Sequence, residues 1–172
     1  PDGRLFVTDM YDRSDNKKGK IYILEGWNPA TKTFDNVTTY MENLHNPNQV
    51  AFYTINGEHF IYVAETGKLT YYSYKAGGWH LTRSLAFHNN KLYVSVGSSC
   101  DACIEKEEVR ATIVEMDPDG KNQRYYARGL RNAVGIHWIG NELWATNMGR
   151  DNRGPDQPEE QLMKIEKDAF YG

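Results

Sequence analysis

Two short segments combine residue types that could hold an anionic ligand and a hard metal ion. In the first, Arg131 and Asn132 lie between two glycines, where a guanidinium fork and an amide suit a carboxylate or a polarised carbonyl. The second segment, 147–156, gathers carboxylates with loop carbonyls, the oxygen ligands that calcium prefers. Its acidic spacing does not match an EF-hand. A capped turn and a solvated acidic loop are the plainer interpretations of the two segments.

His80 is a candidate general base, because a histidine titrates near neutral pH and can take the proton of a hydroxyl group. It follows Trp79 and precedes an apolar strand that begins near Leu85. The alternative is an ordinary polar residue of a loop. The sequence contains no Gly-rich phosphate loop, no Gly-x-Ser-x-Gly and no His-Glu-x-x-His motif.

The two cysteines, Cys100 and Cys103, are separated by only two residues. Such a pair could form a tight disulfide, a redox dithiol or half of a zinc site. A zinc site needs two further ligands, and no histidine is close along the sequence. A Gly-Ser-Ser turn precedes the pair and a charged run follows it, which favours a loop disulfide over a thioredoxin-like dithiol. A disulfide in turn favours an oxidising compartment.

Charge and hydropathy exclude some classes of function. The 172 residues carry a formal net charge of -3, so there is no basic field for nucleic acid. No run reaches the roughly 18 apolar residues of a membrane helix. Forty per cent of the residues are hydrophobic and 13% are aromatic, which is enough apolar material for a core.

The elements that must position these residues are short strands. The apolar runs alternate or are β-branched and aromatic, and Asn-Gly, Asn-Asn, Asp-Gly and Gly-Asn turns separate them. We therefore predict an all-β chain. The predicted strands are 5–8, 20–24, 49–53, 60–64, 69–74, 85–87, 92–96, 112–116, 123–126, 134–138 and 143–146.

One sequence pattern, a turn followed by an apolar-aromatic strand, recurs along the chain. Its copies are at 2–8, 58–64, 90–95 and 141–146, and in the last three a second strand lies upstream, at 50–52, 85–87 and 135–138. A hairpin repeated once per unit of about 40–50 residues is typical of a β-propeller blade. A β-sandwich also contains recurring hairpins, but the similar residue pattern of these hairpins favours the propeller.

The spacing predicts that the propeller is partial. At about 45 residues per blade, the chain supplies roughly four blades or fewer. A propeller must close to hide its sheet edges. We therefore expect a single partial propeller domain over 1–172, with N-terminal and C-terminal blades missing. The second and third copies are too close together, which predicts that a loop is absent from the sequence near 75–79.

Three stretches together resemble the glucose/sorbosone dehydrogenase family, in its sorbosone-dehydrogenase-like branch. They are residues 92–103, 129–132 and 142–151, and the closing 170–172 is similar to the start of the family's Phe-Tyr-Gly-Trp-Pro stretch. The resemblance covers nearly the whole chain. It implies a six-bladed propeller that oxidises a sugar or aldehyde by passing a hydride to pyrroloquinoline quinone (PQQ), with calcium as second cofactor.

The resemblance also implies roles for particular residues. His80 matches the family's general base, Arg131 and Asn132 match its PQQ-binding pair, and the backbone carbonyls of Gly149 and Arg150 match its calcium ligands. It implies a periplasmic or secreted protein that passes electrons to a quinone or a cytochrome c. The family's soluble glucose enzymes have an acidic residue where this chain has Trp79, and a Pro where it has Arg150, so glucose itself is not implied as the substrate.

Two other functions remain open from the sequence. One is a calcium-dependent lactonase on a similar propeller, which would use carboxylate ligands and no quinone. The other is a non-catalytic propeller that binds a partner or a sugar, and such a protein would tolerate the loss of His80.

Overall fold

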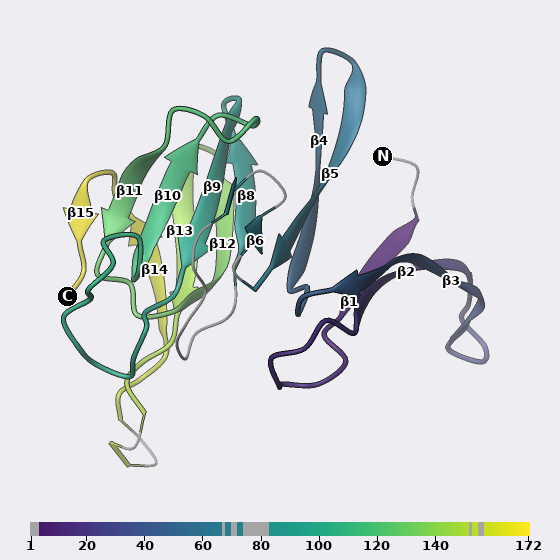
Figure 1. Cartoon of the computed structure of the whole chain (residues 1–172), viewed down its shortest axis with the longest axis horizontal. Helices are drawn as coiled ribbons and strands as arrows, with labels where there is room; N and C mark the ends of the chain where they lie inside the picture. Colours follow the sequence, from purple (N-terminus) through teal and green to yellow (C-terminus); the bar gives the residue numbers. More distant parts are fainter. Residues whose placement is uncertain (1–3, 67, 70–71, 74–82, 152, 155–156) are drawn as a thin grey trace. The chain divides into compact units, whose positions relative to one another are not determined.

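The computed structural model describes residues 4–66, 68–69, 72–73, 83–151, 153–154 and 157–172. Within these ranges every regular element is a strand and no helix occurs. The all-β prediction is therefore confirmed (Figure 1). The chain divides into two compact units, Pro1–Thr70 and Tyr71–Gly172. The loop predicted to be absent near 75–79 lies outside the described residues.

The first unit contains two antiparallel sheets, ordered β1-β2-β3 and β4-β5-β6. Phe6 of β1 and Phe52 of β4 meet edge to face, with ring centroids 4.8 Å apart. The strands are β1 (Leu5–Asp9), β2 (Gly19–Asn28), β3 (Thr33–Leu44), β4 (Gln49–Ile55), β5 (Glu58–Glu65) and β6 (Lys68–Leu69).

The second unit is built on two sheets, ordered β15-β11-β10-β9-β8 and β12-β13-β14, and β12 packs against β8 and β9 (Figure 1). Among the strand pairings of the described residues, the β11–β15 pairing alone is parallel. The strands are β7 (Tyr72–Ser73), β8 (Leu85–His88), β9 (Lys91–Val96), β10 (Thr112–Met116), β11 (Arg124–Arg128), β12 (Ala133–Ile139), β13 (Glu142–Asn147), β14 (Gln161–Ile165) and β15 (Ala169–Phe170).

The hairpins predicted from the repeat are confirmed. They are the antiparallel pairs β4–β5, β8–β9 and β12–β13. The turns Asn56-Gly57 and Asn89-Asn90 have positive φ at both central residues, as a two-residue hairpin loop requires. Each copy of the repeat belongs to a different sheet of the described chain. Ring closure and the number of blades stay predictions.

A single apolar core joins the two sheets of the second unit. Ile113, Leu130 and Leu143 are fully or almost fully buried in it. Because β8, β9, β12 and β13 all contribute to this core, the loops at their ends have a fixed base. Those loops carry the candidate site.

Gly129, at the connection from β11 to β12, has φ +78 and meets the C-terminal residues closely. A Cβ there would lie 2.5 Å from the Gly172 carbonyl oxygen and 2.9 Å from the Tyr171 nitrogen. We expect Gly129→Ala to lower the free energy of unfolding by about 2–3 kcal/mol, because left-handed backbone strain and steric overlap add. Urea unfolding of the full-length protein measures this loss.

Gly140→Ala is the matched control for this prediction. Gly140 has φ +59, and a Cβ there would meet nothing within 4 Å, so only the backbone strain of about 1 kcal/mol applies. Equal losses for the two variants would mean that the C-terminal residues move aside without a penalty.

Candidate functional site around Arg131

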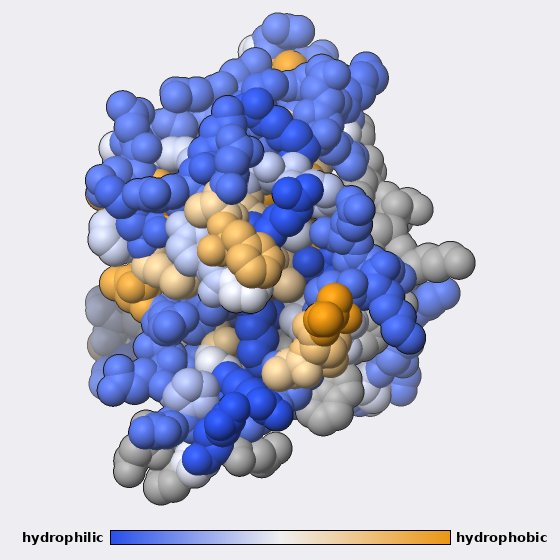
Figure 2. Space-filling model, turned by 90° about the vertical axis from the view of Figure 1, so that its left-hand side faces the viewer, coloured by the Kyte–Doolittle hydropathy of each residue, from blue (hydrophilic) through white to orange (hydrophobic). Residues whose placement is uncertain are grey.

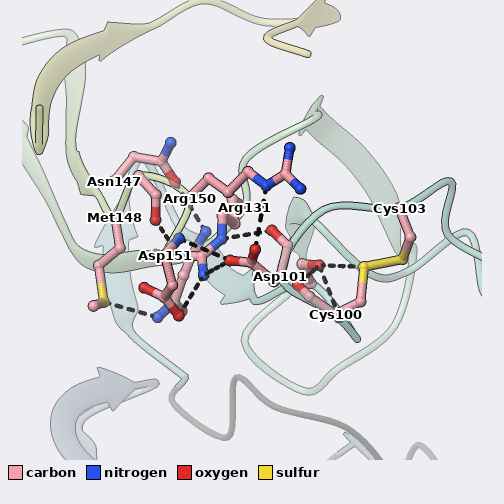
Figure 3. Close-up of polar contacts among 11 residues, drawn as sticks. Cys100, Asp101, Cys103, Arg131, Asn147, Met148, Arg150 and Asp151 are labelled. Carbon is pink, nitrogen blue, oxygen red and sulfur yellow. Dashed lines mark hydrogen bonds and ion pairs between the residues drawn. A yellow bond between two sulfur atoms is a disulfide. The ribbon is translucent and has the colours of Figure 1, made fainter. Parts of the chain in front are cut away.

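Three loops at one end of the second unit bring the candidate residues together (Figure 3). One follows β9 and carries Cys100–Cys103, one leads from β11 into β12 and carries Arg131, and one follows β13 and carries Gly149. β13 pairs with β12 along its whole length, so its end lies beside the start of β12. The backbone N–H of Ser98 donates to the Arg131 carbonyl at 2.7 Å, which ties the first loop to the second.

Arg131 is the centre of the polar contacts in this cluster. Its side chain is only 13% exposed. Nε donates to the carbonyl oxygen of Asp101 at 2.7 Å, and Nη2 donates to Oδ1 of the same residue at 2.6 Å. Nη1 donates to the carbonyl oxygen of Gly149, and Nη2 lies 3.1 Å from Oδ2 of Asp151. The planar guanidinium fork thus links all three loops, a geometry that lysine cannot reproduce.

Asp101 is a site residue that the sequence analysis did not identify. Its carboxylate also accepts the Asp151 N–H at 2.8 Å and the Arg150 Nε at 3.3 Å. The Asp151 N–H, followed by the Arg131 and Arg150 side chains, lowers the pKa of Asp101 below its ordinary value of 3.8. Asp101 is therefore ionised at neutral pH. The one signal in the sequence that could have identified Asp101 is its position between two cysteines, because a disulfide-closed loop holds an acceptor rigidly.

Asn132 is 5% exposed and is bound into the end of β13. Its backbone N–H donates to the Asn147 side-chain oxygen at 2.9 Å, and its side-chain amide lies 3.1 Å from the Met148 sulfur. The Met148 N–H donates in return to the Asn132 carbonyl at 3.0 Å. These contacts fix the backbone on which Arg131 is carried.

Cys100 and Cys103 form a disulfide, with Cα atoms 6.1 Å apart, as the sequence favoured. Their sulfurs and a Glu105 carboxylate oxygen lie within 4.8 Å of one another. Disulfide sulfurs are not thiolates, so this group does not supply the ligands of a zinc site. Glu105 instead accepts hydrogen bonds from the backbone N–H and hydroxyl of Ser99, at 2.9 and 2.5 Å.

A cavity of 730 Å³ borders this cluster. Asp101, Arg131, Gly149 and Arg150 line it together with the apolar side chains of Ile104 and Phe170. Those two side chains are 96% and 74% exposed. Figure 2 shows small apolar patches on this side of the molecule, separated by hydrophilic surface.

Four arginines line the cavity, and two of them, Arg131 and Arg150, have been described above. The other two are Arg110 and Arg128. Arg110 is 4% exposed, as is Arg83, and burial together with the positive charge of Arg110 lowers the pKa of Arg83 to about 9. Arg83 therefore stays protonated at neutral pH. Four carboxylates also line the cavity, those of Asp101, Glu105, Glu108 and Glu159, so its lining offers groups of both charges.

The donor types at the site fit both cofactors that the family resemblance implies. The Gly149 carbonyl and the Asp101 and Asp151 carboxylates are hard oxygen ligands of the kind calcium prefers. The cavity arginines suit the carboxylates of PQQ. In this structure the Gly149 carbonyl accepts a hydrogen bond from Arg131.

His80 and Trp79 lie outside the described residues. The nearest described neighbours of His80 in the sequence are Arg83 and Ser84. The Ser84 hydroxyl donates to the carbonyl of Val134, and its own carbonyl accepts the Ser95 N–H at 3.0 Å. The start of β8 is therefore anchored two residues beyond Asn132, next to the segment that carries Arg131.

Comparison with protein-family models found no match for this chain, and a search of curated proteins found no match either. Among the described residues there is no helix with the length and apolarity needed to cross a membrane.

Proposed function

We propose that this chain is part of a six-bladed β-propeller that oxidises a sugar or an aldehyde with PQQ and calcium. The observation that carries the proposal is the meeting of Arg131, Gly149 and Arg150 at the wall of one 730 Å³ cavity. These residues come from loops that are separate in the sequence. The resemblance assigns all of them to cofactor binding.

The propeller part of the proposal is supported by the repeat. Each copy belongs to its own sheet and forms an antiparallel pair there, and in the second unit two successive sheets pack against each other through one apolar core. This is the relation between neighbouring propeller blades. Six blades remain the number that the resemblance implies.

The residues of the chain would divide the reaction between them. Bound PQQ would supply the two-electron acceptor for the substrate hydride, and calcium would increase its electrophilicity. His80 would take the proton of the substrate hydroxyl at an imidazole nitrogen. Arg131 would donate its remaining N–H to the cofactor oxygen that gains negative charge, while Asp101 holds its guanidinium in place.

The setting is proposed on the same basis. The disulfide is compatible with a periplasmic or secreted protein, where such bonds persist. Electrons would then leave to a quinone or a cytochrome c.

The test is a titration of the full-length protein with PQQ, with and without calcium, while quinone absorbance is followed. We expect saturable PQQ binding that requires calcium and is reversed by a chelator. Addition of a panel of aldoses and aldehydes should then bleach the quinone. A failure to bind PQQ at micromolar concentration would overturn the proposal. Calcium-dependent hydrolysis of lactones in that case would identify a lactonase, and its absence would leave a binding protein.

A further inference from the structure

Asp101 accepts hydrogen bonds from three different residues of the candidate site. Its carboxylate accepts from Arg131 Nη2, from Arg150 Nε and from the Asp151 N–H, at 2.6, 3.3 and 2.8 Å. Its backbone carbonyl accepts a fourth bond, from Arg131 Nε, at 2.7 Å. One residue therefore holds both the guanidinium and the loop after β13 (Figure 3).

The position of Asp101 is fixed by its two flanking cysteines. The Cys100–Cys103 disulfide closes a ring that contains only Asp101 and Ala102 between its ends. The Ser98 hydroxyl donates to the Cys100 carbonyl at 2.7 Å and anchors the first cysteine. Cys103 is exposed, so a reductant can reach the bond. Without the disulfide the segment would regain backbone freedom, which its few remaining contacts must then oppose.

We propose that Asp101 is the positioning residue for Arg131 and for the loop 149–151, and that the Cys100–Cys103 disulfide makes this positioning depend on redox state. A dithiol reductant would transfer two electrons and two protons. The Cys100–Cys103 bond would break to give two protein thiols, and the reductant would leave as its own cyclic disulfide. The consequence for PQQ affinity rests on the proposed function, but the structural coupling does not.

Charge distinguishes this role from simple packing. The groups that face Asp101 are Arg131, Arg150 and Asp151, and Glu105 lies on its own loop. Asp101→Asn keeps the size of the side chain but removes its negative charge, so this variant tests the charge and not the packing.

The experiment measures amide hydrogen exchange of 129–132 and 147–151 in the full-length protein. We expect Asp101→Asn to accelerate exchange of the Asp151 amide about tenfold, because a charge-assisted acceptor is lost. Reduction of the wild-type protein with dithiothreitol should have the same effect, and reoxidation should reverse it.

The matched control is Asp119→Asn. Asp119 is an exposed carboxylate in the β10–β11 turn, paired with Lys121 at 2.8 Å, and its replacement should leave both segments unchanged. Equal exchange in Asp101→Asn and in the control would overturn the positioning role. Unchanged exchange after complete reduction would overturn the redox dependence, whether or not the Asp101 variant folds.

A parallel PQQ titration separates this inference from the proposed function. If PQQ binds, its Kd should rise about tenfold on reduction and in Asp101→Asn. If PQQ does not bind the wild-type protein, the proposed function fails and the exchange measurements still decide the role of Asp101.

Discussion

Replacing His80 with alanine is expected to slow substrate-driven bleaching of the bound quinone by about 10²- to 10⁴-fold. The reason is that hydride departure from an alcohol carbon leaves a hydroxyl proton that must go to a base. Without the imidazole, water is the remaining acceptor. Stopped-flow absorbance under single-turnover conditions measures this step directly. The Kd for PQQ should stay within about twofold, since a proton acceptor for the substrate adds little cofactor affinity.

His59→Ala provides the control for the His80 variant. His59 lies near the tip of the β4–β5 hairpin, where its Nδ1 is 2.8 Å from the Thr54 hydroxyl, and the proposal gives it no part in the reaction. Its bleaching rate should match that of the wild-type protein. A His80→Ala protein that keeps its rate within about threefold would show that another group takes the proton.

Local sequence signals predicted most of the strands correctly. β10 at 112–116 matches fully, but β2 continues four residues beyond the predicted 20–24, and the predicted strand 69–74 corresponds to two short strands, β6 and β7. The Asn-Gly and Asn-Asn turns were equally informative, because few residues tolerate the positive φ that two-residue hairpins need. In these places the local chain chemistry and the final fold agree.

Three strands were missed for a common physical reason. β3 runs through polar residues and is exposed along almost all of its length, so burial imposes no apolar pattern on it. β14 and β15 are short and also largely exposed. β14 pairs with β13, the strand before it, whereas β15 pairs in parallel with β11, three strands earlier than its neighbour β14. A pattern of side chains contains no information about such pairing.

The candidate site was predicted in part. Residue types and the resemblance singled out Arg131, Asn132 and Gly149, and the structure brings these together. Asp101 was missed because no local pattern shows that the loop after β9 reaches the loop after β13, where the Asp151 N–H donates to Asp101. Residue types also do not indicate the direction of a backbone carbonyl, so the hydrogen bond from Arg131 to the Gly149 carbonyl could not be predicted from the sequence.

Arg131→Ala is expected to weaken both the fold and the proposed cofactor site. Its removal leaves the Asp101 and Asp151 carboxylates and the Gly149 carbonyl without their shared donor, which should lower the free energy of unfolding by about 2–4 kcal/mol. The Kd for PQQ should rise about 10- to 100-fold, because one or two charge-assisted hydrogen bonds are lost. Urea unfolding and the quinone titration measure the two effects separately.

Two further variants show which property of Arg131 matters. Arg131→Lys keeps the charge but not the planar fork, so it should recover less than half of the lost free energy of unfolding. Arg150→Ala removes a side chain that is 49% exposed and makes one contact with Asp101 at 3.3 Å, and it should lower that free energy by less than about 1 kcal/mol. Full recovery by lysine would mean that charge alone holds the three loops together. Equal losses of free energy of unfolding in Arg131→Ala and Arg150→Ala would mean that the buried guanidinium fork stabilises the fold no more than a surface ion pair does.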